Sequence, residues 1–181
     1  MLMRQVLTLL MLITSQAVVV AQDSLQATQS NIVFEIKNLG ITVDGTLDQL
    51  QVSGNFNADD WTRTQLSARI PVKTLASGIK MRDRHLMQKE YFHQKEHPFI
   101  FFTSEEITQE EPGRYLMRGM LTIKGTTREE AIRFEAVPTP SGFKLLGEMD
   151  LNRLDYEVGE ESLTLSNELK VKISCILERV S

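Results

Sequence analysis

The three histidines of this chain, His85, His93 and His97, lie in the segment where charged and aromatic residues also concentrate, Arg82 to Phe102. His93 and His97 are four residues apart, a spacing that would place both rings on one face of a helix and allow them to bind a metal. Pro98 argues against that helix, because a residue that precedes proline avoids helical geometry. No carboxylate or cysteine completes a good ligand set in the sequence, so we expect no metal site.

The sequence Arg82-Asp83-Arg84-His85 in the same segment has two interpretations. Arginine suits phosphate, so the cluster could grip an anionic headgroup. Alternatively, Asp83 pairs with Arg82, Arg84 or Arg153 and fixes a local helix in place. We favour the structural interpretation, because ion-pair networks are common and do not by themselves mark function.

The rest of the chain offers few residues for catalysis. No glycine loop for phosphate and no Gly-x-Ser-x-Gly elbow occurs. The lone Cys175 lies on the apolar side of the last predicted strand, where a buried, inert thiol is expected. We therefore expect no catalytic residue, no cofactor and no enzymatic activity.

Most of the sequence alternates between apolar and polar residues, which is typical of half-buried strands. The inward positions include Ile32, Phe34 and Ile36 near the start and Leu169 to Leu177 near the end, and short turns separate the segments. This pattern predicts an all-β fold, an antiparallel closed barrel of about eight strands. One short helix, near residues 77–90 with Ser77 as its N-cap, is expected to cover the barrel.

One predicted strand, Phe99 to Ser104, is apolar on both faces, so it should be covered on both sides. Phe99 and Phe101 share one face, and Ile100 and Phe102 share the other. Alternation alone leaves the inward face undecided. We choose Phe99 and Phe101 as the inward pair.

Composition sets the class of protein. The chain has 181 residues, 41% hydrophobic and 24% charged, with a formal net charge of -4, which gives no support to nucleic-acid binding. Its single cysteine excludes an intramolecular disulfide.

The first residues predict a signal peptide over residues 1–21, cleaved after Ala21: Arg4 is basic, an apolar run extends from Val6 to Ile13, and small residues lead up to Ala21. We expect one domain over residues 22–181, in an exported protein that is periplasmic or secreted.

Four motifs, taken together, resemble the YceI-like family over essentially the whole mature chain. Arg82-Asp-x-His85-Leu86, then Tyr91-Phe92 and His97-Pro98-x-Ile100-x-Phe102, resembles the central family motif. The other three are Gly119-x-Leu-Thr-Ile-Lys-Gly125-Thr-Thr127, Leu151-Asn-Arg153-x-Asp155-Tyr156, and Ser30-x-x-x-Phe34-x-Ile36-x-Asn38-Leu39-Gly40. The resemblance implies a bacterial, lipocalin-like barrel whose tunnel binds a polyisoprenoid chain, such as a quinone or prenyl phosphate.

The expected ligand-binding residues are the large apolar side chains on the inward positions of the strands. They are Phe34, Ile36, Phe56, Leu66, Ile70, Phe99, Phe101, Leu121, Phe134, Leu145, Met149 and Ile173. Such a protein would serve as carrier, store or stress-related scavenger. It would contact a membrane only transiently, to exchange lipid. The sequence does not decide between a monomer and a homodimer. One alternative is a non-catalytic interaction or stress-response barrel with a filled core. Another is a hydrolase or isomerase of a lipid-like substrate, for which only Cys175 and Tyr115 are candidates.

Overall fold

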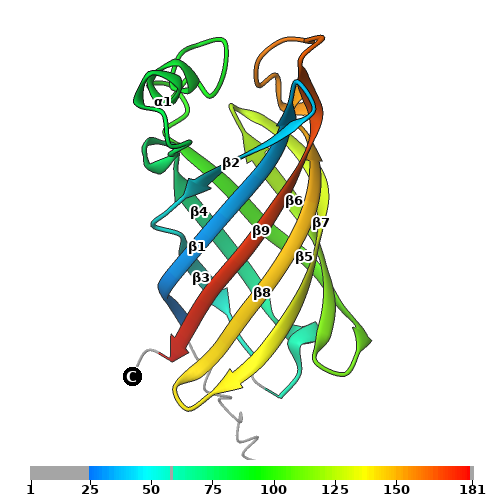
Figure 1. Cartoon of the computed structure of the whole chain (residues 1–181). Helices are drawn as coiled ribbons and strands as arrows, with labels where there is room; N and C mark the ends of the chain where they lie inside the picture. Colours follow the sequence, from blue (N-terminus) through cyan, green and yellow to red (C-terminus); the bar gives the residue numbers. More distant parts are fainter. Residues whose placement is uncertain (1–24, 58, 180–181) are drawn as a thin grey trace, which may run out of the picture.

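The computed structural model describes residues 25–57 and 59–179, and this part of the chain forms one sheet of nine antiparallel strands (Figure 1). The strands are β1 (Leu25–Asn38), β2 (Ile41–Leu47), β3 (Gln51–Asn55), β4 (Gln65–Pro71), β5 (Phe99–Glu111), β6 (Arg114–Ile123), β7 (Thr126–Thr139), β8 (Gly142–Asn152) and β9 (Leu165–Arg179). Their order across the sheet is β2-β1-β9-β8-β7-β6-β5-β4-β3. The all-β, antiparallel prediction is confirmed. The predicted signal peptide lies outside the described residues.

The described residues form nine strands where the sequence predicts about eight, because β1 and β2 are separate strands joined by a hairpin. Leu39 and Gly40 both have positive φ, of 50° and 78°. Two such residues reverse the chain in the tight turn that suits a two-residue hairpin. Asn38 consequently pairs with Ile41, and Ile41–Leu47 runs back along β1 as a separate strand.

The sheet curls so that its edge strand β3 contacts β1 near the other edge. Leu50, just before β3, donates its backbone N–H to the Ser30 side chain of β1 over 3.2 Å. In residues 25–57 and 59–179, no strand ladder joins β3 to β1 or β2. The strand pairing therefore gives a curled sheet, and it does not demonstrate the closed barrel that the sequence predicts.

The single α-helix in the described residues, α1 (Lys80–Leu86), sits at one end of the curled sheet (Figure 1). It is shorter than the predicted helix over residues 77–90. Ile79 occupies the N-cap position without a side-chain hydrogen bond, so the prediction of Ser77 as N-cap is wrong. Ser77 instead donates its backbone N–H and its hydroxyl to Asp83 Oδ1. Residues 88–97, which follow, form hydrogen-bonded turns.

Aromatic rings fill the opposite end of the sheet. Trp61, in a short 3-10 helix (η1, Trp61–Arg63), packs its ring 4.9 Å from Phe56 and 5.3 Å from both Phe134 and Phe143, measured between centroids. Tyr115 stacks on Phe134 at 5.2 Å. We call these five residues the aromatic plug. It closes the interior at the end away from α1.

Candidate functional site: an apolar cavity beneath α1

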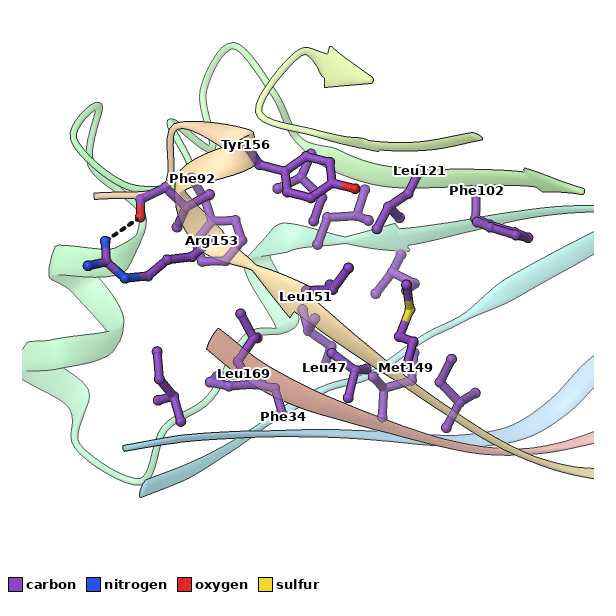
Figure 2. A pocket seen from close by; sticks show the side chains of 18 of the residues that line it. Phe34, Leu47, Phe92, Phe102, Leu121, Met149, Leu151, Arg153, Tyr156 and Leu169 are labelled. Atoms are coloured by element: carbon purple, nitrogen blue, oxygen red, sulfur yellow. Dashed lines mark hydrogen bonds between the residues drawn. The ribbon is translucent and has the colours of Figure 1, made fainter. Parts of the chain in front are cut away.

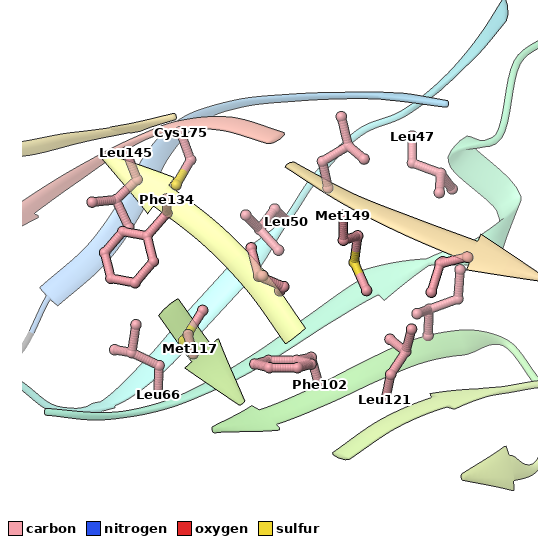
Figure 3. Packing of buried hydrophobic residues seen from close by; sticks show 14 of the residues in the cluster. Leu47, Leu50, Leu66, Phe102, Met117, Leu121, Phe134, Leu145, Met149 and Cys175 are labelled. Carbon is pink, nitrogen blue, oxygen red and sulfur yellow. The ribbon is translucent and has the colours of Figure 1, made fainter. Parts of the chain in front are cut away.

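A cavity of about 530 Å³ lies inside the curled sheet, and its lining extends from Phe134 of the aromatic plug to Arg82, His85 and Leu86 of α1. Figure 2 shows side chains of this lining, among them Phe34, Met149 and Arg153. Apolar side chains from all nine strands line it, on the inward positions that the alternation predicts, and Figure 3 shows several of them. Nine of the predicted ligand-binding residues are on this lining: Phe34, Ile36, Leu66, Ile70, Leu121, Phe134, Leu145, Met149 and Ile173. The volume falls in the range typical of pockets for small organic ligands.

The predicted inward face of β5 is wrong. Phe101 is 45% exposed and Phe99 is half-buried on the outer surface, where Arg69 lies 5.4 Å from the Phe99 ring. The inward side chains are Ile100 and Phe102, both buried and both on the cavity lining. Strand pairing explains why Ile100 and Phe102 point inward, because residues directly opposite one another on neighbouring strands share a face of the sheet.

The pairing partners on both neighbouring strands agree. Ile100 pairs with Ile70 on β4, and Phe102 pairs with Ala68 on β4 and with Leu121 on β6. All three partners line the cavity. The inward face of β5 is thus fixed by its register with β4 and β6, which the composition of β5 alone does not reveal.

Phe56 is a second correction to the predicted ligand-binding residues. It is buried, but it belongs to the aromatic plug and does not line the cavity. Phe56 follows directly after β3, which ends at Asn55, and its side chain points into the interior as the alternation predicts. It lies at the end that the aromatic rings fill, beyond the part of the cavity that Val52 of β3 lines. The Phe56 ring packs against Phe143 at 5.3 Å between centroids.

Two inward glycines have different effects on the cavity. Gly147 lines it, and no bulky side chain of its own fills the space there. Gly119 instead makes room for its neighbours, because a Cβ atom would lie 2.2 Å from Thr103 O and 2.8 Å from the Phe102 ring. The β5 register shift between Ser104 and Glu106 lies opposite Gly119. Gly147 therefore contributes space, whereas Gly119 accommodates a bulge.

Polar side chains gather where the cavity reaches α1 and the β8–β9 loop, and we call this end the mouth. Its polar lining residues are Asn38, Ser77, Arg82, His85, Tyr91, Arg153, Glu160, Ser162 and Thr164. The sequence pattern missed most of them as cavity residues, because they come from loops and helix ends that only the fold brings together. The available signal was the family motifs, which contain five of them: Asn38, Arg82, His85, Tyr91 and Arg153.

Hydrogen bonds of Arg82 and Asp83 with Ser77 support a structural role for the charged cluster, although in the described residues Asp83 forms no salt bridge with an arginine. Arg82 Nε donates to Ser77 Oγ over 2.7 Å, and Arg82 also bonds the Ser77 carbonyl. The two hydrogen bonds from Ser77 hold the pKa of the Asp83 carboxyl below its ordinary value. Ser77 thus links both charged residues and fixes the loop that leads into α1.

Arg153 is buried at the mouth, where each of its three guanidinium nitrogens donates a hydrogen bond (Figure 2). It donates to the carbonyls of Ser166 and Val158 over 3.0 Å each and to Asn167 Oδ1 over 2.9 Å. These bonds tie the 3-10 helix η3 (Arg153–Tyr156) to the β8–β9 loop and to β9. Arg153 therefore shapes the mouth, and its partner is not Asp83.

The two candidate nucleophiles are poorly placed for catalysis. Cys175 is buried on the cavity lining, and burial raises the pKa of its thiol to about 11. A nucleophilic cysteine needs the opposite shift, toward a lower pKa. Tyr115 lies in the aromatic plug and does not line the cavity. The geometry gives the hydrolase or isomerase interpretation no support.

The YceI-like domain model matches residues 24–177, which is nearly the whole described fold. The chain belongs to the YceI-like family. Among relatives of this YceI-like protein, a UPF0312 protein of Photorhabdus laumondii is 24% identical over 155 residues, 81% of this chain and 80% of the relative. A UPF0312 protein of Staphylococcus aureus is 31% identical over 107 residues, 59% of this chain and 60% of that protein.

Solved structures share the fold. BcnA of Burkholderia cenocepacia superposes with a TM-score of 0.76 at 19% identity, covering 82% of this chain and 95% of that one. A polyisoprenoid binding domain of Saccharophagus degradans, implicated in plant cell wall breakdown, superposes with a TM-score of 0.65 at 11% identity, covering 88% and 100%. At these identities the likeness establishes the architecture. In the described residues, no helix is long and apolar enough to cross a membrane.

Proposed function

We propose that this protein is an exported lipid-binding protein that holds a polyisoprenoid-type chain, a quinone or prenyl phosphate, in its cavity. The observation that carries the proposal is the apolar cavity of about 530 Å³ that the aromatic plug closes at one end. A hollow interior argues against the alternative of an interaction barrel with a filled core. The name of the structural neighbour that binds polyisoprenoids agrees with this class of ligand.

The physical chemistry of the site suits an apolar chain. Each ligand methylene removed from water contributes about 0.8 kcal/mol, so a chain of ten buried carbons gains roughly 8 kcal/mol before the cost of ordering. The lining offers few polar partners away from the mouth, so binding depends on burial rather than on directed hydrogen bonds. The tail would lie toward the aromatic plug and the headgroup toward Arg82 and His85.

In this proposal the sheet acts as a lipocalin-like closed barrel. Side chains and the Leu50–Ser30 hydrogen bond would cover the gap between the edge strands, in place of a backbone ladder. The protein would serve as a carrier, store or scavenger. Its predicted signal peptide would place it in the periplasm or outside the cell.

Transient contact with a membrane would load and unload the ligand through the mouth. Five of the large apolar side chains that are exposed belong to segments around it: Leu39, Ile41, Ile79, Met81 and Leu163. The Leu39 N–H donates to Thr164 O over 2.8 Å, so the β1–β2 turn meets the β8–β9 loop there. Exposed apolar tips beside a lipid-sized cavity suit brief insertion between lipid headgroups.

The proposal is tested by purifying the protein from its native host without detergent, extracting it with organic solvent and analysing the extract by mass spectrometry. We expect an isoprenoid at close to one molecule per chain. The matched control is the Ala68→Phe variant, which narrows the cavity and should carry much less. An extract without apolar lipid, or equal lipid on both proteins, would overturn the proposal.

A further inference from the structure

Two histidines and a carboxylate meet on one turn outside the cavity. The nitrogen or oxygen atoms that His93, Glu96 and His97 offer as ligands all lie within 4.8 Å of one another. His93 Nδ1 is 3.6 Å from Glu96 Oε2, and the two imidazole centroids are 5.7 Å apart. None of the three lines the cavity.

The backbone preorganises this cluster. Glu96 and His97 both donate their N–H groups to the His93 carbonyl, over 3.0 and 2.9 Å, so one helical-type turn spans the three residues. Pro98 argues against a helix that carries both histidines, and the structure has a single turn there, which ends at His97 before the chain becomes extended. The expectation that no carboxylate completes the set is wrong, because Glu96 lies one residue before His97.

Neighbouring segments limit the motion of both histidines. The His93 N–H donates to Gln88 O over 2.9 Å, which anchors the start of the turn. The His97 ring packs over Gly125, where a Cβ atom would lie only 2.8 Å from His97 Cε1. Both histidines are half-buried, so less side-chain entropy remains to be lost when they bind a ligand.

We propose that His93, Glu96 and His97 form a binding site for a divalent transition metal, with Zn²⁺ as the reference ion. Two imidazoles and one carboxylate suit Zn²⁺, Ni²⁺ or Cu²⁺, whereas Mg²⁺ and Ca²⁺ favour oxygen ligands alone. Tetrahedral Zn²⁺ with bonds of about 2.0–2.1 Å needs ligand atoms about 3.3 Å apart. His93 and Glu96, at 3.6 Å, are already near that separation. Small rotations of the Glu96 side chain and of the two imidazoles would close the remaining separations, which are at most 4.8 Å. Water takes the fourth position.

The test is a titration of the untagged, full-length mature protein with Zn²⁺ by isothermal calorimetry, because a histidine tag would bind the same ion. We expect one Zn²⁺ per chain. His93→Gln should weaken the affinity at least tenfold and Glu96→Gln severalfold. Two controls should leave it unchanged: His85→Gln removes the one histidine outside the cluster, and Glu90→Gln removes an exposed carboxylate from the same segment.

A spectroscopic signature separates a formed site from loose surface binding. Co²⁺ should give the intense visible bands of a tetrahedral complex in the wild-type protein, and His93→Gln should abolish them while far-UV circular dichroism stays unchanged. A tenfold excess of Mg²⁺ should not displace the Co²⁺. The proposal is overturned if Zn²⁺ shows no saturable binding below millimolar concentration, or if His85→Gln weakens affinity as much as His93→Gln. Neither readout depends on the lipid that the cavity holds.

Discussion

Ala68 offers a direct way to fill the cavity from a single position. It lies on β4, lines the cavity and faces Phe102 across the β4–β5 ladder. Ser67, its neighbour, is exposed on the outer face of the same strand. Ala68→Phe therefore places a phenyl ring inside the cavity, and Ser67→Phe places the same ring outside it.

The expected loss of affinity follows from the volume of the ring. A dry protein cavity of about 150 Å³ accommodates one benzene molecule, so a phenyl ring takes up to roughly a quarter of the 530 Å³. It should displace about four to six ligand carbons. At about 0.8 kcal/mol for each carbon, the loss is about 3–5 kcal/mol, which is at least a hundredfold in Kd.

The assay is displacement of a fluorescent fatty-acid analogue by geranylgeraniol from delipidated protein. Ala68→Phe should bind at least a hundredfold more weakly, whereas Ser67→Phe should match the wild-type protein. Thermal unfolding supplies an independent check, because a ring that enters an empty cavity avoids the 1–3 kcal/mol cost of overpacking a filled core. Wild-type affinity in Ala68→Phe, or equal losses in both variants, would refute the assignment of the cavity as the binding site.

Three further outcomes are expected. Cys175 should react with a maleimide at pH 8 roughly a hundredfold more slowly than a thiol of pKa 9, because burial raises its pKa to about 11; a reaction at the rate of a free thiol would contradict this. The folded-state pKa of Asp83 lies below its ordinary value of 3.8, so the stability that its hydrogen bonds contribute is fully present above pH 3.8 and is lost as the pH falls through the folded-state pKa. Asp83→Asn should therefore lose less stability on acidification than the wild-type protein, as measured by urea unfolding at several pH values. Arg153→Ala should lower the free energy of unfolding by about 3 kcal/mol, because one buried and two partly buried acceptors lose their donor. Phe101→Ala, on the exposed face, should change it by less than about 1 kcal/mol. Similar losses for the two variants would count against the role of the buried Arg153.

Alternation of apolar and polar residues predicted the strands well because each strand has one face on a common interior. The inward positions of β1, β6 and β9 follow directly from that period, and Phe34, Leu121 and Ile173 line the cavity as expected. The period fails where a segment is apolar on both faces. For Phe99 and Phe101 the register with the neighbouring strands decides the face, and this information lies outside the segment.

The mouth and the histidine cluster were harder to predict for a related reason. Arg153 and Tyr91 reach the cavity from segments about 60 residues apart, and no local pattern marks them as neighbours. His93 and His97 were visible as a pair, but the turn that adds Glu96 depends on hydrogen bonds that precede Pro98. Local rules describe strands; loops at the ends of a sheet take their shape from contacts that the whole fold supplies.

The aromatic plug gives the cavity a fixed depth. Trp61 and Phe134 close one end, so a chain that enters at the mouth stops against a rigid floor. Lining positions on β9 run from Leu165 to Leu177, about 40 Å along the strand, or roughly 30 Å along the axis of a sheet tilted as barrels are. In the proposed function, such a pocket would discriminate between ligands by chain length. Shorter chains would leave it partly empty, and longer ones would leave their excess length projecting from the mouth.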